Sequence, residues 1–346
     1  MAEKNARPGT GGENYVPYDA RSGAESVVYF TRDLSPEGLV RIYDRVSAVL
    51  SGRVAVKLHT GEPHGPNIIP RPWVKNLLEE RLPEANIIET NTYYPSDRYT
   101  TEQHRKTLKI NGWNFCKVDI TDEDGTAELP VPEGKWFDVM SVGKNMLEYD
   151  SMLTLTHFKG HMMGGFGGSN KNIGIGCADG RLGKGWIHSN TGLQNQWDVK
   201  QEELMEKISE STKATISFFK DHVCYINIMR NMSVSCDCEG VEAQPVTVPD
   251  VGIVASLDIL AADQACVDLL YALPEESKKD LVARIESRHG HRQLSYMKEM
   301  GMGNDLYRLI DIDHEDRVIT AAQAVEGISG NWIPDQWNED VKKIRR

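Results

Sequence analysis

Short apolar segments alternate with amphipathic segments over the first third of the chain, and this alternation restricts the fold more than any other feature. Ser35 and Pro36 mark the start of a helix, and Asn111-Gly112 marks the end of another. Alternation with such short connections is typical of a mostly parallel sheet with helices on both faces, so we predict an α/β fold. Strands are expected at 26–32, 53–58, 86–92 and 115–120, and helices at 35–50, 70–82 and 100–112.

The same alternation returns in the second half, where residues 251–273 predict a strand followed by a helix that Asp258 could cap. Between the halves, residues 121–135 are acidic and rich in proline. We therefore expect two α/β lobes with a cleft between them. The predicted divisions are a flexible arm at 1–24, an N-terminal lobe at 25–140 and a C-terminal lobe at 141–346.

The formal charge of −12 argues against nucleic acid or an anionic membrane as the main partner. No apolar run approaches the ~20 residues that a membrane-spanning helix needs, and the N-terminus has no apolar signal region. Six cysteines in 346 residues do not resemble a secreted disulfide framework. A cytoplasmic protein with a small-molecule partner is the expectation.

Polar side chains follow two of the predicted strands at their carboxyl ends. His59 comes after the second strand, and Asn91, Thr92 and Tyr93 come at or after the end of the third. Ligands of parallel α/β sheets bind beyond these strand ends. We predict that the four side chains line one crevice.

The stretch from Thr156 to Asn190 concentrates glycine, histidine and lysine. Gly167 and Gly168 allow the backbone to approach a ligand, and a helix starting near Asn170 would present free N–H groups to an anion. Lys159 could also bind an anion. The spacing does not match a Walker A loop, which disfavours a nucleotide site. The alternative is a tight loop without a ligand.

Three residues of this stretch are the expected catalytic group, namely His161, Lys171 and His188. Histidine is the usual proton donor or acceptor at neutral pH, and lysine supplies a positive charge or an amine for covalent attachment. Each histidine alone more often has a structural role. The three together predict action on a small anionic molecule.

Cys236 and Cys238 are the expected metal ligands, because residues i and i+2 of an extended segment face the same way. Cys177, on the glycine-rich stretch, could join them. The alternative is that the two are ordinary buried cysteines. Asp263 could orient a histidine or a metal ligand.

Several long motifs resemble the domain-of-unknown-function family 362, whose members are often labelled iron–sulfur-centre proteins. They are the stretch from Thr156 to Ser189 and the segments 89–104, 236–271 and 300–310. The resemblance implies the fold of that family. Many members carry a ferredoxin-like cysteine insert after the final histidine, but here Cys224 is the only cysteine between His188 and Cys236. This departure disfavours a ferredoxin-type cluster.

A more distant resemblance is to the nickel-dependent lactate racemases, through His161, Gly167-Gly168, Lys171 and His188. It implies that Lys171 carries a nickel cofactor, that His188 binds nickel and that His161 acts as acid or base. The racemases place a second acid/base histidine after the third strand, where this chain has Asn91-Thr92-Tyr93.

Two classes of function follow. The first is a metal-dependent or acid/base enzyme that acts on a small anionic metabolite, with isomerase-like or lyase-like chemistry. The second is a protein that binds a metal ion or an iron–sulfur cluster without turnover, as a carrier or redox partner.

Overall fold

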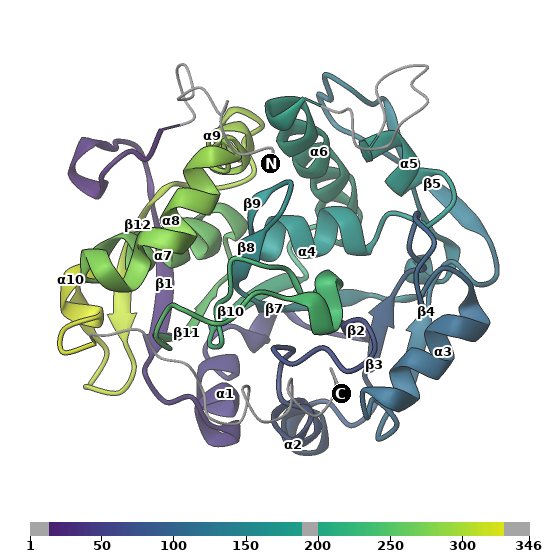
Figure 1. Ribbon diagram of the computed structural model, residues 1–346, viewed down its shortest axis with the longest axis horizontal. Coiled ribbons are helices and arrows are strands. Elements are labelled where there is room, and N and C mark those ends of the chain that lie inside the picture. Colours follow the sequence, from purple (N-terminus) through teal and green to yellow (C-terminus); the bar gives the residue numbers. More distant parts are fainter. Residues whose placement is uncertain (1–13, 189–199, 329–346) are drawn as a thin grey trace.

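A single sheet of nine strands runs through the part of the chain that the computed structural model describes, residues 14–188 and 200–328 (Figure 1). Five strand pairings are parallel (β1–β12, β7–β10, β2–β7, β2–β3 and β3–β4), and three are antiparallel. The predicted α/β fold with a mostly parallel sheet is confirmed. In spatial order the strands are β13 (Arg317–Ile319), β12 (Leu306–Asp311), β1 (Glu25–Thr31), β11 (Gly252–Ser256), β10 (Val223–Met229), β7 (Ser151–His157), β2 (Val54–Lys57), β3 (Asn86–Glu89) and β4 (Val118–Ile120).

Helices cover both faces of the sheet because successive strand residues point to opposite sides. Val54 and Val56 pack into the apolar layer of one face, and Ala55 packs into the layer of the other. The first layer holds α1 (Pro36–Tyr43), α2 (Arg71–Arg81) and α3 (Thr101–Ile110). The second holds α4 (Ser169–Gly176), α5 (Gly183–His188), α6 (Gln201–Phe219), α7 (Ile259–Ala272), α8 (Glu275–Ser287), α9 (Arg292–Glu299) and α10 (Ala321–Ala324).

Helix starts follow the capping signals of the sequence. The Ser35 side chain accepts from the Gly38 N–H at the start of α1, and Asp258 accepts from the Ala261 N–H at the start of α7. Thr100 and Gln103 form a reciprocal capping box at the start of α3. The two predicted caps, Ser35 and Asp258, are therefore present.

Strands of the two expected lobes are interleaved. β7, β10 and β11, which belong to the expected C-terminal lobe, lie between β1 and β2 of the expected N-terminal lobe. The two expected lobes therefore share one sheet. Local periodicity could not predict this interleaving. The strand β1 pairs with β11, whose residues lie more than 200 positions later in the chain.

The described part of the expected arm, residues 14–24, is docked on the body of the protein. The two terminal guanidinium nitrogens of Arg21 donate to the Asp268 carboxylate at 2.6 Å, and both side chains are almost fully buried. The Tyr18 hydroxyl donates to the Tyr307 carbonyl at 2.6 Å. Residues 1–13 of the expected arm lie outside the described residues.

Within residues 14–188 and 200–328, two separate hairpins and four short 3-10 helices accompany the nine-stranded sheet and its helices. The hairpins are β5 (Thr126–Pro130) with β6 (Val139–Gly143), and β8 (Lys159–His161) with β9 (Gly165–Gly167). The 3-10 helices are η1 (Tyr18–Ala20), η2 (Ser47–Val49), η3 (Lys144–Glu148) and η4 (Asp237–Glu242).

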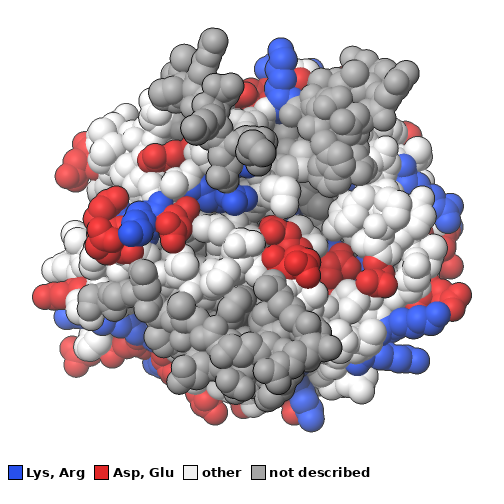
Figure 2. All heavy atoms as spheres, in the orientation of Figure 1, with Lys and Arg blue, Asp and Glu red and all other residues white. Residues whose placement is uncertain are grey.

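Among the described helices, none combines the length and apolar character that crossing a bilayer requires. On the face of the molecule in Figure 2, the acidic and basic side chains of the described residues are interspersed.

Candidate functional site

A cavity of about 280 Å³ lies beyond the carboxyl ends of β2 and β3, where α4, α5, α6 and η4 meet. β2 and β3 are parallel neighbours, so the residues that follow them reach the same edge of the sheet. Side chains from both sequence halves form its wall. The lining includes Lys57, His59, Glu89, Thr90, Thr92, Tyr93, Tyr94, Arg98, His161, Met162, Met163, Lys171, Asn172, Ile175, Lys184, His188, Leu204, Ile208, Cys238 and Glu239.

The predicted catalytic group and most of the predicted crevice lie in this wall. His161, Lys171 and His188 line the cavity together with His59, Thr92 and Tyr93. Asn91 does not. Its side chain donates to the Thr101 hydroxyl and contacts the His104 ring, so it points toward α3.

His161 is held by the tight turn between β8 and β9. Its Nδ1 accepts the backbone N–H of Gly164 at 2.8 Å and that of Met163 at 3.3 Å. Gly165 adopts a φ of 75°, which only glycine takes readily, and thereby closes the turn. A nitrogen that accepts two N–H groups carries no hydrogen of its own, so the hydrogen of the neutral ring resides on Nε2.

His188 at the end of α5 has the opposite tautomer. Its Nδ1 lies 2.8 Å from the Lys184 carbonyl, which can only accept, so Nδ1 carries the hydrogen and Nε2 is the acceptor nitrogen. Burial lowers the pKa of His188 to about 4. Burial and the charge of Lys171 hold the pKa of His161 well below its usual value. Both rings are therefore neutral at pH 7.

Positive charge exceeds negative charge around the cavity. Lys57 is paired with Glu89 at 2.8 Å, and Arg98 with Glu62 at 2.9 Å. For Lys171 and Lys184, no carboxylate partner lies within 4.0 Å among the described residues. Two lysines therefore face the cavity without a carboxylate partner among the described residues, which favours an anionic ligand.

Lys57, Glu89 and Arg98 are cavity residues that the sequence analysis missed. Lys57 and Glu89 are the last residues of β2 and β3, and both are nearly fully buried. Burial opposes ionisation of Glu89, but Lys57, His59 and Arg98 hold its pKa well below the usual range. A charged residue that ends an otherwise apolar strand was the available signal.

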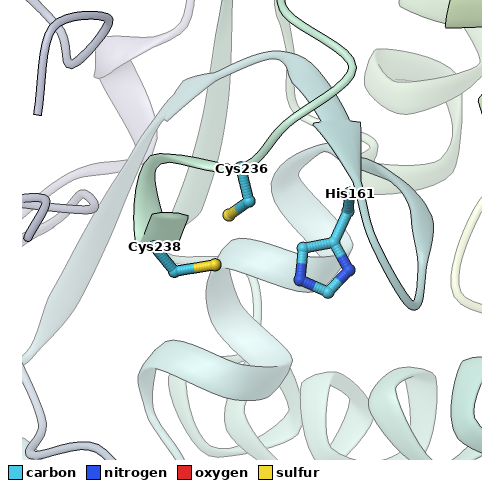
Figure 3. A group of neighbouring side chains, drawn as sticks. All are labelled: His161, Cys236 and Cys238. Carbon is cyan, nitrogen blue, oxygen red and sulfur yellow. The ribbon is translucent and has the colours of Figure 1, made fainter. Parts of the chain in front are cut away.

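Cys236 and Cys238 lie next to His161 (Figure 3), and the sulfur and nitrogen atoms of the three lie within 4.8 Å of one another. Gly160 makes this approach possible, because a side chain there would collide with the Val234 carbonyl at 2.4 Å. Cys238 reaches the cavity, whereas Cys236 is buried behind it. A hydrogen bond from Cys238 holds the pKa of Cys236 well below its usual range.

Asp237 anchors the turn that carries the two cysteines. Its carboxylate accepts from His157 Nδ1 at 2.9 Å and lies 3.1 Å from Lys159 Nζ. His157 Nε2 lies 2.7 Å from the Arg230 carbonyl, so both ring nitrogens donate. Lys159, predicted to bind a ligand, is thus used to hold this turn and is absent from the cavity wall.

The cysteine pair fits a soft metal ion better than His161 does. Two sulfurs, one of them on a thiol of lowered pKa, are suitable ligands for such an ion. A histidine that binds metal usually donates its other ring N–H to an acceptor. His161 instead accepts at Nδ1, so a metal at Nε2 would have to replace the ring hydrogen.

Other predicted ligand residues serve the start of α4. Asp263 accepts the N–H groups of Ser169 at 2.7 Å and Asn170 at 2.9 Å, so an internal carboxylate occupies the place expected for an external anion. Burial raises the pKa of Asp263 to about 6. Gly167 and Gly168 precede this helix, and Asn170 lies in its first turn. None of the three belongs to the cavity wall.

Cys177, the third predicted metal ligand, caps the other end of α4. It does not belong to the group formed by His161, Cys236 and Cys238. Burial raises the pKa of its thiol to about 12. It is also absent from the cavity wall, so its position supports packing.

Comparison with known proteins gives a family and several distant solved structures. The model of the family described as "Domain of unknown function (DUF362)" matches residues 54–268, which include the whole cavity wall. Comparison with curated proteins gives no match. The lactate racemase apoprotein from Thermoanaerobacterium thermosaccharolyticum is 12% identical, with 89% of this chain and 93% of that chain covered and a TM-score of 0.39. A protein from Thermotoga maritima is 16% identical, with 56% and 49% covered and a TM-score of 0.35.

Proposed function

The chain belongs to the DUF362 family, and because the matched segment contains the whole cavity wall, we propose that this cavity is the active site of an enzyme. The proposed reaction moves a proton on a small anionic metabolite. Isomerases and lyases are the reaction classes that such a transfer serves. The volume of about 280 Å³ suits a metabolite-sized ligand.

One observation carries this proposal, the opposite tautomers of two neutral imidazoles in one cavity wall. His188 offers an acceptor at Nε2, and His161 offers a donor at Nε2. One ring can therefore remove a proton while the other delivers one. Positioned proton transfer of this kind typically contributes 10²- to 10⁴-fold to a rate.

Lys171 and Lys184 are the proposed contacts of the anionic group. Both line the cavity and neither has a carboxylate partner among the described residues. An ammonium close to the reacting carbon would also stabilise negative charge that develops when a proton leaves.

Deuterium exchange tests the proposal without a known substrate. The protein is incubated in D₂O with a panel of small 2-hydroxy, 2-amino and 2-oxo acids. NMR follows loss of the signal of the carbon-2 hydrogen of the hydroxy and amino acids and of the carbon-3 hydrogens of the oxo acids. We expect exchange with at least one acid, reduced roughly 100-fold or more in His188→Gln.

His222 supplies a matched control for this variant. It is exposed on the surface, and its Nδ1 contacts the Val49 carbonyl at 2.8 Å, as His188 Nδ1 contacts that of Lys184. His222→Gln should exchange at the wild-type rate. Exchange that survives in His188→Gln at the wild-type rate would refute the role of His188.

The second candidate function is metal binding without turnover, and the proximity of Cys236, Cys238 and His161 favours it. Metal content of protein purified without oxygen is the test. A stoichiometric ion that is lost in Cys236→Ser/Cys238→Ser, with the fold intact, would support it. A brown chromophore would indicate a cluster, and unchanged metal content in the variant would exclude this site.

A further inference from the structure

Lys184 has an unusual environment for a buried lysine. The residue is 6% exposed, and its side chain extends from α5 to the cavity wall. Its Nζ donates to the Thr90 hydroxyl at 2.6 Å and to the Asn91 carbonyl. Thr90 itself donates toward the carbonyls of Gly176 and Ala178, so its oxygen is free to accept.

Lys57, in the same wall, has a carboxylate partner, and Lys184 has none among the described residues. Lys57 is buried too, but it is paired with the Glu89 carboxylate at 2.8 Å. For Lys184, no carboxylate lies within that reach among the described residues. Burial lowers the pKa of Lys184 to about 8, against the attraction of Asp122 and Glu89 and with the help of Arg98 and Lys57.

Lys184 is mainly an ammonium at pH 7, but its lowered pKa also makes the neutral amine accessible near this pH, and the amine can keep both contacts. An amine has two hydrogens and one lone pair, and the two hydrogens are used by Thr90 and Asn91. The lone pair is the remaining position on Nζ, and Lys184 lines the cavity. An uncharged lysine amine at a ligand cavity is a nucleophile.

We propose that Lys184 forms an imine with a carbonyl-bearing small anion, such as a 2-oxo acid or an aldehyde acid. This inference rests on the proposed function, since the ligand is an anion bound in the same cavity. Lys171, which has no carboxylate partner among the described residues, would hold the carboxylate of that ligand.

The step balances without a redox partner. The Nζ lone pair adds to the carbonyl carbon, and one amine hydrogen passes to the carbonyl oxygen. That oxygen leaves as water, with a proton delivered from the cavity, and the C=N bond forms. The resulting iminium keeps one N–H, which can still donate to the Asn91 carbonyl. Such an iminium withdraws electrons from the neighbouring carbon and eases loss of its proton.

Reductive trapping with glyoxylate tests this proposal. Glyoxylate carries both an aldehyde and a carboxylate, and cyanoborohydride adds hydride to its imine to give a stable carboxymethyl-lysine that peptide mapping locates. At pH 7 and limiting reagent, we expect Lys184 to be labelled at least tenfold faster than the exposed Lys75 and Lys106, since more of it is present as amine. Lys57 in the same sample should stay unlabelled.

Variants separate a nucleophile from a structural cation. Lys184→Arg keeps the charge and the donors, so it should fold, as checked by thermal unfolding, and lose the label. Acetaldehyde, which lacks the carboxylate, should prefer Lys184 less strongly than glyoxylate does, because the lowered pKa then favours this lysine without a bound carboxylate. Labelling of exposed lysines with Lys184 unmodified, or labelling of Lys171 in its place, would overturn the proposal.

The proposed function and the imine fail in distinguishable ways. Glycolate has the carboxylate of glyoxylate but no carbonyl. If glycolate binds in a calorimetric titration and hydrogen exchange occurs while Lys184 stays unlabelled, the imine alone is refuted. If Lys184 is labelled but no acid of the panel exchanges, the imine stands and the proton-transfer proposal fails.

Discussion

At the scale of single residues, the chemistry open to the cavity depends on which nitrogen of each imidazole carries the hydrogen. Backbone groups decide this in both cases, two N–H groups at His161 and one carbonyl at His188. Backbone groups do not titrate, so the assignment holds wherever the rings are neutral. Metal ligation by His161 at Nε2 would require loss of the hydrogen on that nitrogen, whereas proton donation from Nε2 uses this hydrogen.

The charge of Lys184 predicts how ligand affinity depends on pH. Since burial lowers its pKa to about 8, Lys184 is an ammonium below that pH and an amine above it. Affinity for a small carboxylate should therefore fall as pH rises through about 8. A charge-assisted hydrogen bond is worth about 1.5–3 kcal/mol, so the loss should be roughly tenfold or more.

Calorimetric titrations between pH 6 and pH 9.5 measure this loss, with the best-binding acid of the panel. Lys184→Arg remains charged throughout the range, so its affinity should stay nearly constant. A wild-type affinity that does not change between pH 7 and pH 9.5 would show that Lys184 does not contact the anion.

At the scale of elements, α4 connects the glycine-rich stretch to the rest of the fold through one buried carboxylate. Asp263 accepts from the first two N–H groups of the helix and from the Asn227 amide at 2.9 Å. Lys171 lies in the first turn of this helix. The cap therefore fixes the helix turn that presents Lys171 to the cavity.

Asp263→Ala should lower the free energy of unfolding by about 2 kcal/mol or more, because it leaves two buried N–H groups without a partner. Urea unfolding followed by circular dichroism measures the change. Asp221 is exposed, so Asp221→Ala should differ from wild type by less than about 0.5 kcal/mol. Equal stability of the two variants would mean that α4 does not depend on this cap.

Sequence patterns predicted the helices and strands better than the long-range contacts between them. Ser35 and Asp258 were recognisable as caps because each bonds to an N–H three residues ahead. Asp263 caps a helix that begins 94 positions earlier in the chain, which no local pattern indicates. The cavity was predicted in part for the same reason. His59 and Thr92 follow strand ends, whereas the burial of Lys184 depends on contacts such as that with Thr90, 94 positions earlier in the chain.

At the scale of the whole molecule, side-chain contacts join segments that lie far apart in the chain. The ion pair of Arg21 with Asp268 joins residues 247 positions apart, and the Tyr307 hydroxyl donates to the same carboxylate at 2.7 Å. The described residues 14–24 thus belong to the folded body. The cavity lies on the other half of the sheet, beyond β2 and β3.

Arg21→Met should destabilise the protein by about 3–5 kcal/mol, because it leaves the Asp268 charge buried without its cation. The double variant Arg21→Met/Asp268→Asn removes both charges and should recover much of the loss. Urea unfolding compares the three proteins. A cost below about 1 kcal/mol for Arg21→Met would show that the segment is not held by this pair.

The central claim is that His161 and His188 are neutral imidazoles of opposite tautomer in one cavity, and long-range ¹H–¹⁵N NMR of histidine-labelled protein at pH 7 tests it most directly. His161→Gln and His188→Gln assign the two sets of signals. The claim predicts a hydrogen on Nε2 of His161 and on Nδ1 of His188, with neither ring charged. Two rings of the same tautomer, or a doubly protonated His188 at this pH, would contradict it.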